Sequence, residues 1–136
     1  GKSRVEGLKY TDLNLYELER IRRKFPDVRI MFGKDESLLY ALPVGVDGAI
    51  GSTYNFTLKM FKRLWNAYRE GRIREAEELQ HQANRIISQM LRVKNIIAAE
   101  KYLLGKKGIQ CGNCRAPFRP LTEEEKHILD GIGDVE

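Results

Sequence analysis

Three short apolar runs, spaced about twenty residues apart, constrain the fold of this chain more than any other feature. They cover residues 7–11, 28–32 and 48–51, and amphipathic segments lie between them. This spacing is typical of βα units, in which each strand is followed by a helix and the strands pair in parallel. The sequence therefore predicts an α/β fold with three parallel strands.

Helical periodicity fills the segments between these runs. Apolar residues recur at helical spacing over 13–25, and Pro26 is expected to end that helix. Asp35 and Glu36 follow the second run, where negative charge suits the positive end of a helix dipole. A helix is therefore expected to begin at this pair.

The second half of the chain has a different pattern, with one helical stripe after another. These stripes cover 58–68, 73–90 and 96–104, and Thr122 has the signature of a cap before a last short helix. The segment from Gly105 to Pro120 is rich in Gly, Pro and Cys and is predicted to be a loop. We therefore divide the chain into three βα units over 1–71 and a helical extension over 72–136.

Three parallel strands leave a sheet incomplete, because both of its edges are exposed. All-parallel sheets normally contain more strands and have both faces covered. The first expected strand also begins within a few residues of Gly1. From this pattern we expect the chain to be the end of a longer one.

Charge and composition exclude some classes of protein. The 136 residues include 24 Lys and Arg against 19 Asp and Glu, a net charge of +5 that would assist binding to any anion. The basic clusters over 20–24 and 59–63 lie at helical spacing, so we interpret them as solvated helix faces and predict no nucleic-acid partner. No apolar run reaches the roughly 20 residues of a membrane span. Two cysteines do not make a secreted disulfide framework, so a cytoplasmic location is expected.

Lys9 is the first residue with a distinctive chemistry. Side chains alternate along a strand, so Lys9 and Thr11 share one face and Leu8 and Tyr10 share the other. Burial lowers the pKa of a lysine ammonium, and the neutral amine can then attack a carbonyl carbon to form a Schiff base. The alternative is an edge-strand lysine whose ammonium reaches solvent. The spacing by itself leaves both interpretations open.

The other two strands also end in polar or glycine-containing clusters. Gly33, Asp35 and Glu36 follow the second run, and the third ends in Gly51 and Ser52. Ligands of parallel α/β folds bind at the carboxyl ends of the strands. Carboxylates there can accept hydrogen bonds from sugar hydroxyls, and exposed amides and hydroxyls suit a carboxylate. The alternative for the acidic pair is an ordinary helix start.

Cys111 and Cys114 have the C-x-x-C spacing of a redox pair or of half a zinc site. A structural zinc needs four ligands, and the remaining candidates, His81 and His127, are not at zinc-finger spacing. We therefore predict neither a metal nor a cofactor.

Taken together, the strand segments resemble the aldolase family that contains N-acetylneuraminate lyase and dihydrodipicolinate synthase, and its lyase branch in particular. The resemblance rests on Gly7-Leu8-Lys9-Tyr10-Thr11, on Gly33-Lys34-Asp35-Glu36 and on Gly48-Ala49-Ile50-Gly51-Ser52-Thr53-Tyr54-Asn55. It extends in order to about Pro120, where Cys114-Arg115-Ala116-Pro117-Phe118 resembles the family's closing loop. It implies the carboxyl-terminal half of a (β/α)₈ TIM barrel, strands six to eight, followed by extra helices.

The resemblance also implies a role for each site residue. Lys9 would be the Schiff-base lysine and Thr11 a substrate contact. The residues implied to hold the sugar-derived part are Gly33, Asp35, Glu36 and Ser52. Those implied to lie beside pyruvate are Ile50 and Gly51. The implied reaction is cleavage of N-acetylneuraminate to N-acetylmannosamine and pyruvate, without a metal, in a homo-oligomer that is usually a tetramer.

Two groups of the family's site have no counterpart in this sequence: an early carboxylate-binding Gly-Ser-Thr loop and a proton-shuttling tyrosine. Tyr10 cannot replace that tyrosine, because it is expected to face away from Lys9. The chain alone is therefore expected to form the imine poorly. The alternatives are another pyruvate-dependent aldolase, such as dihydrodipicolinate synthase, or a truncated non-catalytic relative that binds small acids or a partner chain through its open edges.

Overall fold

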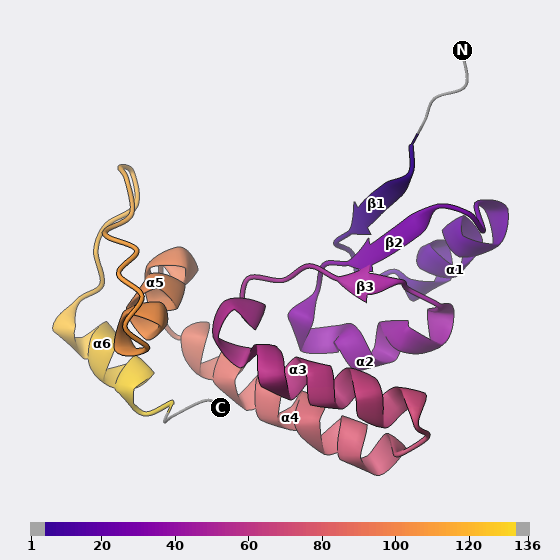
Figure 1. Cartoon of the computed structure of the whole chain (residues 1–136). Coiled ribbons are helices and arrows are strands. Elements are labelled where there is room, and N and C mark those ends of the chain that lie inside the picture. Colours follow the sequence, from indigo (N-terminus) through magenta and orange to yellow (C-terminus); the bar gives the residue numbers. More distant parts are fainter. Residues whose placement is uncertain (1–4, 133–136) are drawn as a thin grey trace.

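A three-stranded parallel sheet with the strand order β1-β2-β3 forms one side of the molecule (Figure 1). The computed structural model describes residues 5–132. The strands are β1 (Gly7–Tyr10), β2 (Arg29–Phe32) and β3 (Gly48–Ala49). The predicted α/β fold is confirmed, although β1 and β3 end slightly earlier than expected. The backbone N–H of Ile50 still donates to the carbonyl of Phe32 at 2.9 Å, so the pairing continues just beyond β3.

Helices account for most of the remaining chain, close to their predicted positions. They are α1 (Leu15–Lys24), α2 (Leu38–Ala41), α3 (Tyr54–Arg69), α4 (Ile73–Met90), α5 (Ile96–Lys106) and α6 (Glu123–Asp130). Short 3-10 turns precede and follow α2, at Asp35–Ser37 and Leu42–Val44, so the helix expected at Asp35 begins as a 3-10 turn. Within residues 5–132, no helix has both the length and the apolar character needed to cross a membrane.

The two faces of the sheet differ in character. Tyr10, Ile30 and Phe32 are buried on the face that packs against the helices. The strand register places Lys9 beside Met31, and Met31 beside Gly48, on the opposite face. A Cβ atom at Gly48 would lie 2.6 Å from the Met31 sulfur, so glycine leaves room for that side chain. This alternation is the one that the sequence predicted for β1.

The helices α3 and α4 run side by side beneath the strands, and α2 lies between them and the sheet (Figure 1). Ala76, Leu79 and Ala83 of α4 belong to the same buried core as the sheet. A second core joins the start of α3 and the end of α4 to the last helices, through Phe56, Met90, Val93, Ala99, Leu103 and Leu129. The division of the chain after residue 71 stays a prediction, and α4 packs across it.

Arg22 corrects one interpretation of the sequence. We expected the cluster over 20–24 to be a solvated helix face, but the side chain of Arg22 is only 18% exposed. Its guanidinium donates to the carbonyls of Pro26 and Val28, both at 3.0 Å, and pairs with Asp47. The Asp47 carboxylate also accepts from the N–H of Ile30 at 2.7 Å. Arg22 therefore links the end of α1 to the loop before β2 and, through Asp47, to the residue before β3.

We expect Asp47→Asn to destabilise the protein at neutral pH by about 1 kcal/mol, since solvent screens a side chain that is 41% exposed. The N–H of Ile30 and the Arg22 guanidinium hold the pKa of Asp47 below its ordinary value. The stabilisation is therefore present above about pH 4 and is lost as the pH falls through the lowered pKa.

Urea unfolding of both proteins between pH 3 and 7 tests this expectation, with the exposed Asp27→Asn as the matched control. A difference in the free energy of unfolding that stays constant over this range would contradict it.

Candidate active site

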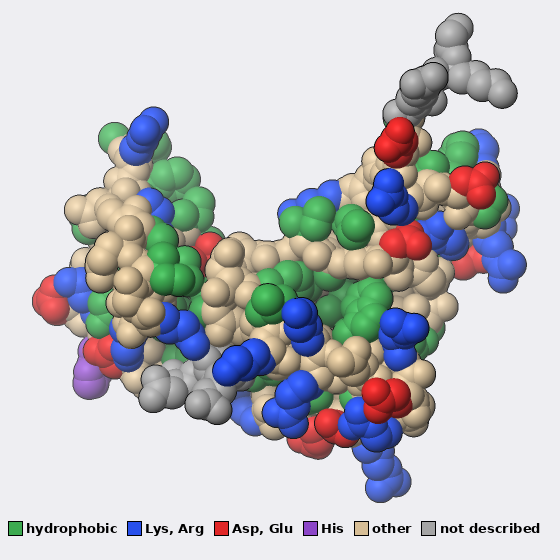
Figure 2. All heavy atoms as spheres, in the orientation of Figure 1, with side chains coloured by type: hydrophobic (Ala, Val, Ile, Leu, Met, Phe, Trp, Pro, Cys, Tyr) green, Lys and Arg blue, Asp and Glu red, His purple; other side chains and the backbone are tan. Residues whose placement is uncertain are grey.

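A cavity of about 510 Å³ opens at the carboxyl ends of the strands. The space-filling view shows the molecule hollowed between the strands and the lobe formed by α5, α6 and their connecting loop (Figure 2). The predicted site residues that line the cavity are Lys9, Thr11, Gly33, Asp35, Glu36, Gly51 and Ser52. Ile50 is not among the lining residues, and 49% of its surface is exposed. The tertiary structure thus gathers most of the predicted residues from three strand ends into one place.

Lys9 and Thr11 approach the backbone of Gly33 from the neighbouring strand. A Cβ atom at Gly33 would lie 2.7 Å from Cε of Lys9 and would overlap the Thr11 hydroxyl. Glycine is therefore required at Gly33 for these two side chains to lie where they do. Lys9 itself is exposed and lies on β1, at the edge of the sheet. This agrees with the alternative in which its ammonium reaches solvent.

Asp35 is the most buried polar group of the site, with 6% of its surface exposed. Its carboxylate accepts from the backbone N–H of Thr53 at 3.1 Å and from the Thr53 hydroxyl at 2.5 Å. A Cβ atom at Gly51 would overlap the same carboxylate. Asp35 thus connects the end of β2 to the loop after β3. Its charge also acts on Tyr54, whose pKa is raised first by burial and then by Asp35.

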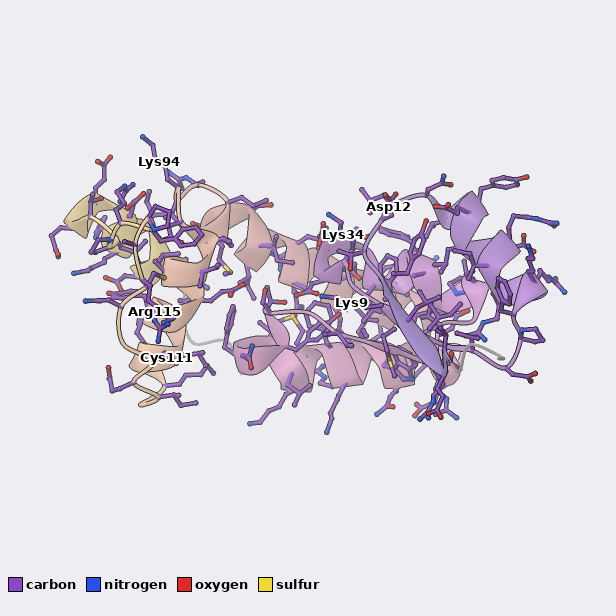
Figure 3. The ribbon with its side chains drawn as sticks, turned by 90° about the horizontal axis from the view of Figure 1, so that it is seen from above. Lys9, Asp12, Lys34, Lys94, Cys111 and Arg115 are labelled. Atoms are coloured by element: carbon purple, nitrogen blue, oxygen red, sulfur yellow. The ribbon has the colours of Figure 1, made fainter. Side chains whose placement is uncertain are left out.

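Glu36 is more accessible and lies 3.6 Å from the ammonium of Lys34. Lys9 and Lys34 both line the cavity near the strand ends (Figure 3). The cavity lining therefore carries both positive and negative groups. Lys34, Asp35 and Glu36 are adjacent in the sequence, whereas Lys9 comes from the neighbouring strand.

Tyr10 faces away from the cavity, as the strand alternation predicted. Its single O–H is shared between two acceptors, the carbonyl of Asn14 at 2.9 Å and the carboxylate of Glu17 at 3.0 Å. Burial and the hydrogen bond to Glu17 raise the pKa of Tyr10 to about 12. Tyr10 is therefore not placed to exchange a proton at Lys9.

Gln80 of α4 is a buried residue that the sequence interpretation missed. Its amide nitrogen donates to the carbonyl of Asp35 at 3.0 Å, and its amide oxygen accepts from the N–H of Leu39 at 3.0 Å. The side chain therefore holds the turn that carries Asp35 and Glu36. Its position on the apolar stripe with Leu79 and Ala83 is the signal that could have identified it, since a fully buried amide needs hydrogen-bond partners.

Glu100 of α5 is a second missed residue of the cavity lining. Burial raises the pKa of its carboxyl, side-chain hydrogen bonding from Ser52 lowers it, and the charge of Asp35 raises it again. No pattern in the sequence places Glu100 near the strand ends, because about fifty residues separate it from the last strand.

Cys111 lies in the lobe that contains α5, away from Lys9 and Lys34 (Figure 3), and Cys114 lines the same separate pocket. Both are free thiols. The ammonium of Lys101 donates to the carbonyls of Cys111 at 3.1 Å and Asn113 at 3.2 Å, and so holds this loop against α5. Within residues 5–132, no group of three or more His, Cys, Asp or Glu side chains is arranged to hold a metal ion.

Parallel βα units with their polar groups gathered at the carboxyl ends of the strands define part of a (β/α)₈ barrel of the aldolase type. Residues 2–132 match the dihydrodipicolinate synthetase family, and the chain belongs to this family of lyases.

Similar solved structures are N-acetylneuraminate lyases. The lyase from Fusobacterium nucleatum is 35% identical over 94% of this chain and 44% of that chain, with a TM-score of 0.88. CdNal from Clostridium difficile, solved in complex with mannosamine, is 37% identical over 91% of this chain and 42% of that chain, with a TM-score of 0.86. The lyase from Mycoplasma synoviae is 30% identical over 96% of this chain and 44% of that chain, with a TM-score of 0.87. The chain thus spans less than half the length of these relatives.

We expect Gly33→Ala to destabilise the protein by about 1–3 kcal/mol, because the added methyl group overpacks the space shared with Lys9 and Thr11. Urea unfolding measures the loss. Gly105→Ala is the control, since a Cβ atom there would meet nothing closer than 3.9 Å. Equal stability of the two variants would contradict the close approach of β1 and β2 at this point.

We expect Gln80→Ala to lower the free energy of unfolding by about 2–3 kcal/mol, because it leaves the N–H of Leu39 and the carbonyl of Asp35 without their buried partner. Chemical denaturation, with the partly exposed Gln82→Ala on the same helix as the control, tests this expectation. Hydrogen exchange should also become faster at Leu39, and unchanged exchange there would argue against the assigned contact.

Proposed function

We propose that this chain carries the Schiff-base lysine and part of the substrate site of an aldolase that cleaves N-acetylneuraminate to N-acetylmannosamine and pyruvate. The observation that carries the proposal is the position of Lys9, beside Thr11 and against Gly33, at the strand ends that open into the cavity. The similarity to N-acetylneuraminate lyases supports the choice of substrate.

In the proposed reaction, the neutral amine of Lys9 attacks the keto carbon of the substrate, and water leaves to give an imine. Once the imine is protonated, the bond between the carbon next to the imine carbon and the hydroxyl-bearing carbon beyond it can break. A base takes the proton of that hydroxyl, which becomes the aldehyde oxygen of the departing N-acetylmannosamine, and the bonding electron pair moves toward the imine nitrogen. An enamine of pyruvate stays on Lys9. Protonation of the enamine carbon and addition of water then release pyruvate and restore the amine.

The remaining predicted residues have proposed binding roles. Thr11 would contact the substrate beside Lys9. Asp35, Glu36 and Ser52, with the open backbone at Gly33, would hold the hydroxylated part, because carboxylates and hydroxyls accept hydrogen bonds from sugar hydroxyls. Ile50 and Gly51 would lie beside the pyruvate part. For Asp35 the hydrogen bonds from Thr53 favour a role that includes holding the loop after β3.

The proposed reaction also needs a group that moves protons near the imine, and Tyr10 is not placed to do so. We propose that this group and the site for the substrate carboxylate belong to the other strands of a complete barrel. The units over 1–71 would then form one side of that barrel and 72–136 its helical extension. A cytoplasmic location and a homo-oligomeric state stay predictions, the former in keeping with the free thiols Cys111 and Cys114.

Trapping with pyruvate and borohydride, followed by mass spectrometry, tests the proposal. In this chain we expect only a weak reduced adduct at Lys9, which Lys9→Ala abolishes and the exposed Lys59→Ala keeps. The same experiment on a chain extended upstream shows whether Lys9 is reactive in this chain by itself or needs the rest of the barrel. Adduct in the extended chain alone supports the assignment and shows that the other strands are required.

No adduct in either protein would overturn the lyase assignment and favour a non-catalytic binding module. Adduct without release of N-acetylmannosamine from N-acetylneuraminate would favour another pyruvate-dependent aldolase, such as dihydrodipicolinate synthase.

A further inference from the structure

Glu100 reaches the cavity from the helical part of the chain and not from a strand end. It lies in α5 and lines the same cavity as Lys9 and Ser52. The start of α5 is held firmly, because Asn95 caps it by accepting from the N–H of Ala98 at 3.1 Å and donates to the carbonyl of Arg119 at 3.0 Å. Glu100 is therefore carried on a fixed helix.

The surroundings of Glu100 distinguish it from the other carboxylates of the cavity. Glu36 lies beside the Lys34 ammonium, and Asp35 is engaged by Thr53. In the part of the chain that the structure describes, Glu100 forms no ion pair, and Ser52 and Asp35 are the residues whose side chains act on its pKa. It is partly buried, and both this burial and the charge of Asp35 raise the pKa of its carboxyl. A partly buried carboxylate with so few partners keeps acceptor capacity for a ligand.

We propose that Glu100 is a further substrate-contacting residue, whose carboxylate accepts a hydrogen bond from a hydroxyl of the polyhydroxylated part of the substrate. The inference rests on the proposed function, which supplies a substrate of this class. A hydroxyl donor matches a carboxylate acceptor that already faces Ser52, and such charge-assisted hydrogen bonds are stronger than neutral ones. Glu100 would then add a carboxylate from the helical part of the chain to the cavity that Asp35 and Glu36 line from the strand ends.

Sugar binding and pyruvate trapping, measured on the same proteins, separate this inference from the proposed function. Binding of N-acetylmannosamine is measured by calorimetry in the extended chain, and the pyruvate adduct at Lys9 by reduction with borohydride. We expect Glu100→Gln to weaken sugar binding about tenfold or more through loss of a charged acceptor, with adduct formation changed less than twofold. Glu77→Gln, an exposed residue of α4, is the matched control and is expected to change neither quantity.

Glu100→Asp tests whether the loss of sugar binding comes from the carboxylate or from a change in structure. It keeps the charge but withdraws it from the cavity, so we expect intermediate sugar binding and a thermal unfolding midpoint close to that of the unaltered protein. Sugar binding that Glu100→Gln leaves unchanged, with the adduct intact, would overturn the inference and leave the proposed function standing. Absence of both the adduct and sugar binding in the unaltered protein would overturn both.

Discussion

The arrangement of this molecule depends on the burial of one carboxylate, that of Asp35. A buried charge is costly unless hydrogen bonds compensate for it, so the groups around Asp35 must be in place together. The N–H and hydroxyl of Thr53 donate to it, and only a glycine at Gly51 leaves room for it. The backbone carbonyl of Asp35 in turn accepts from Gln80 of α4. One residue therefore fixes the end of β2 relative to both the last strand and the helical layer.

This constraint determines which groups reach the cavity. With the turn at Asp35 held from below by Gln80, Glu36 and Lys34 extend toward the open side of the strand ends. The sheet divides its residues in the same way, since Tyr10 and Phe32 are buried among the helices while Lys9 lies on the other face. The cavity and the core thus use opposite faces of the same strands. This separation allows polar groups to gather at one edge without interrupting the core.

The helical part of the chain does more than cover the sheet. Gln80 of α4 positions the acidic turn, and Glu100 of α5 adds a carboxylate to the cavity lining. The similarity to N-acetylneuraminate lyases covers this region as well as the strands, because the matched part extends over 94% of the chain for the lyase from Fusobacterium nucleatum. Strand ends and helices therefore line one cavity, although they are distant in the sequence.

The sequence by itself determined the order and type of the elements, because periodicity and caps are properties of neighbouring residues. The apolar runs predicted the strands, Pro26 predicted the end of α1, and the hydrogen-bonded pair of Thr122 and Glu125 at the start of α6 follows from its capping signature. Alternation along β1 likewise predicted that Lys9 and Tyr10 would face opposite ways.

Only the tertiary structure decided which distant residues meet. Arg22 was expected in solvent and instead pairs with Asp47, Gln80 reaches the turn at Asp35, and Glu100 arrives beside Ser52. Each of these contacts depends on how a helix packs against a loop more than fifteen residues away, which no local pattern encodes. The physical reason is that local propensity sets backbone conformation, whereas buried charges and amides take their partners from whatever the packing brings within hydrogen-bonding distance.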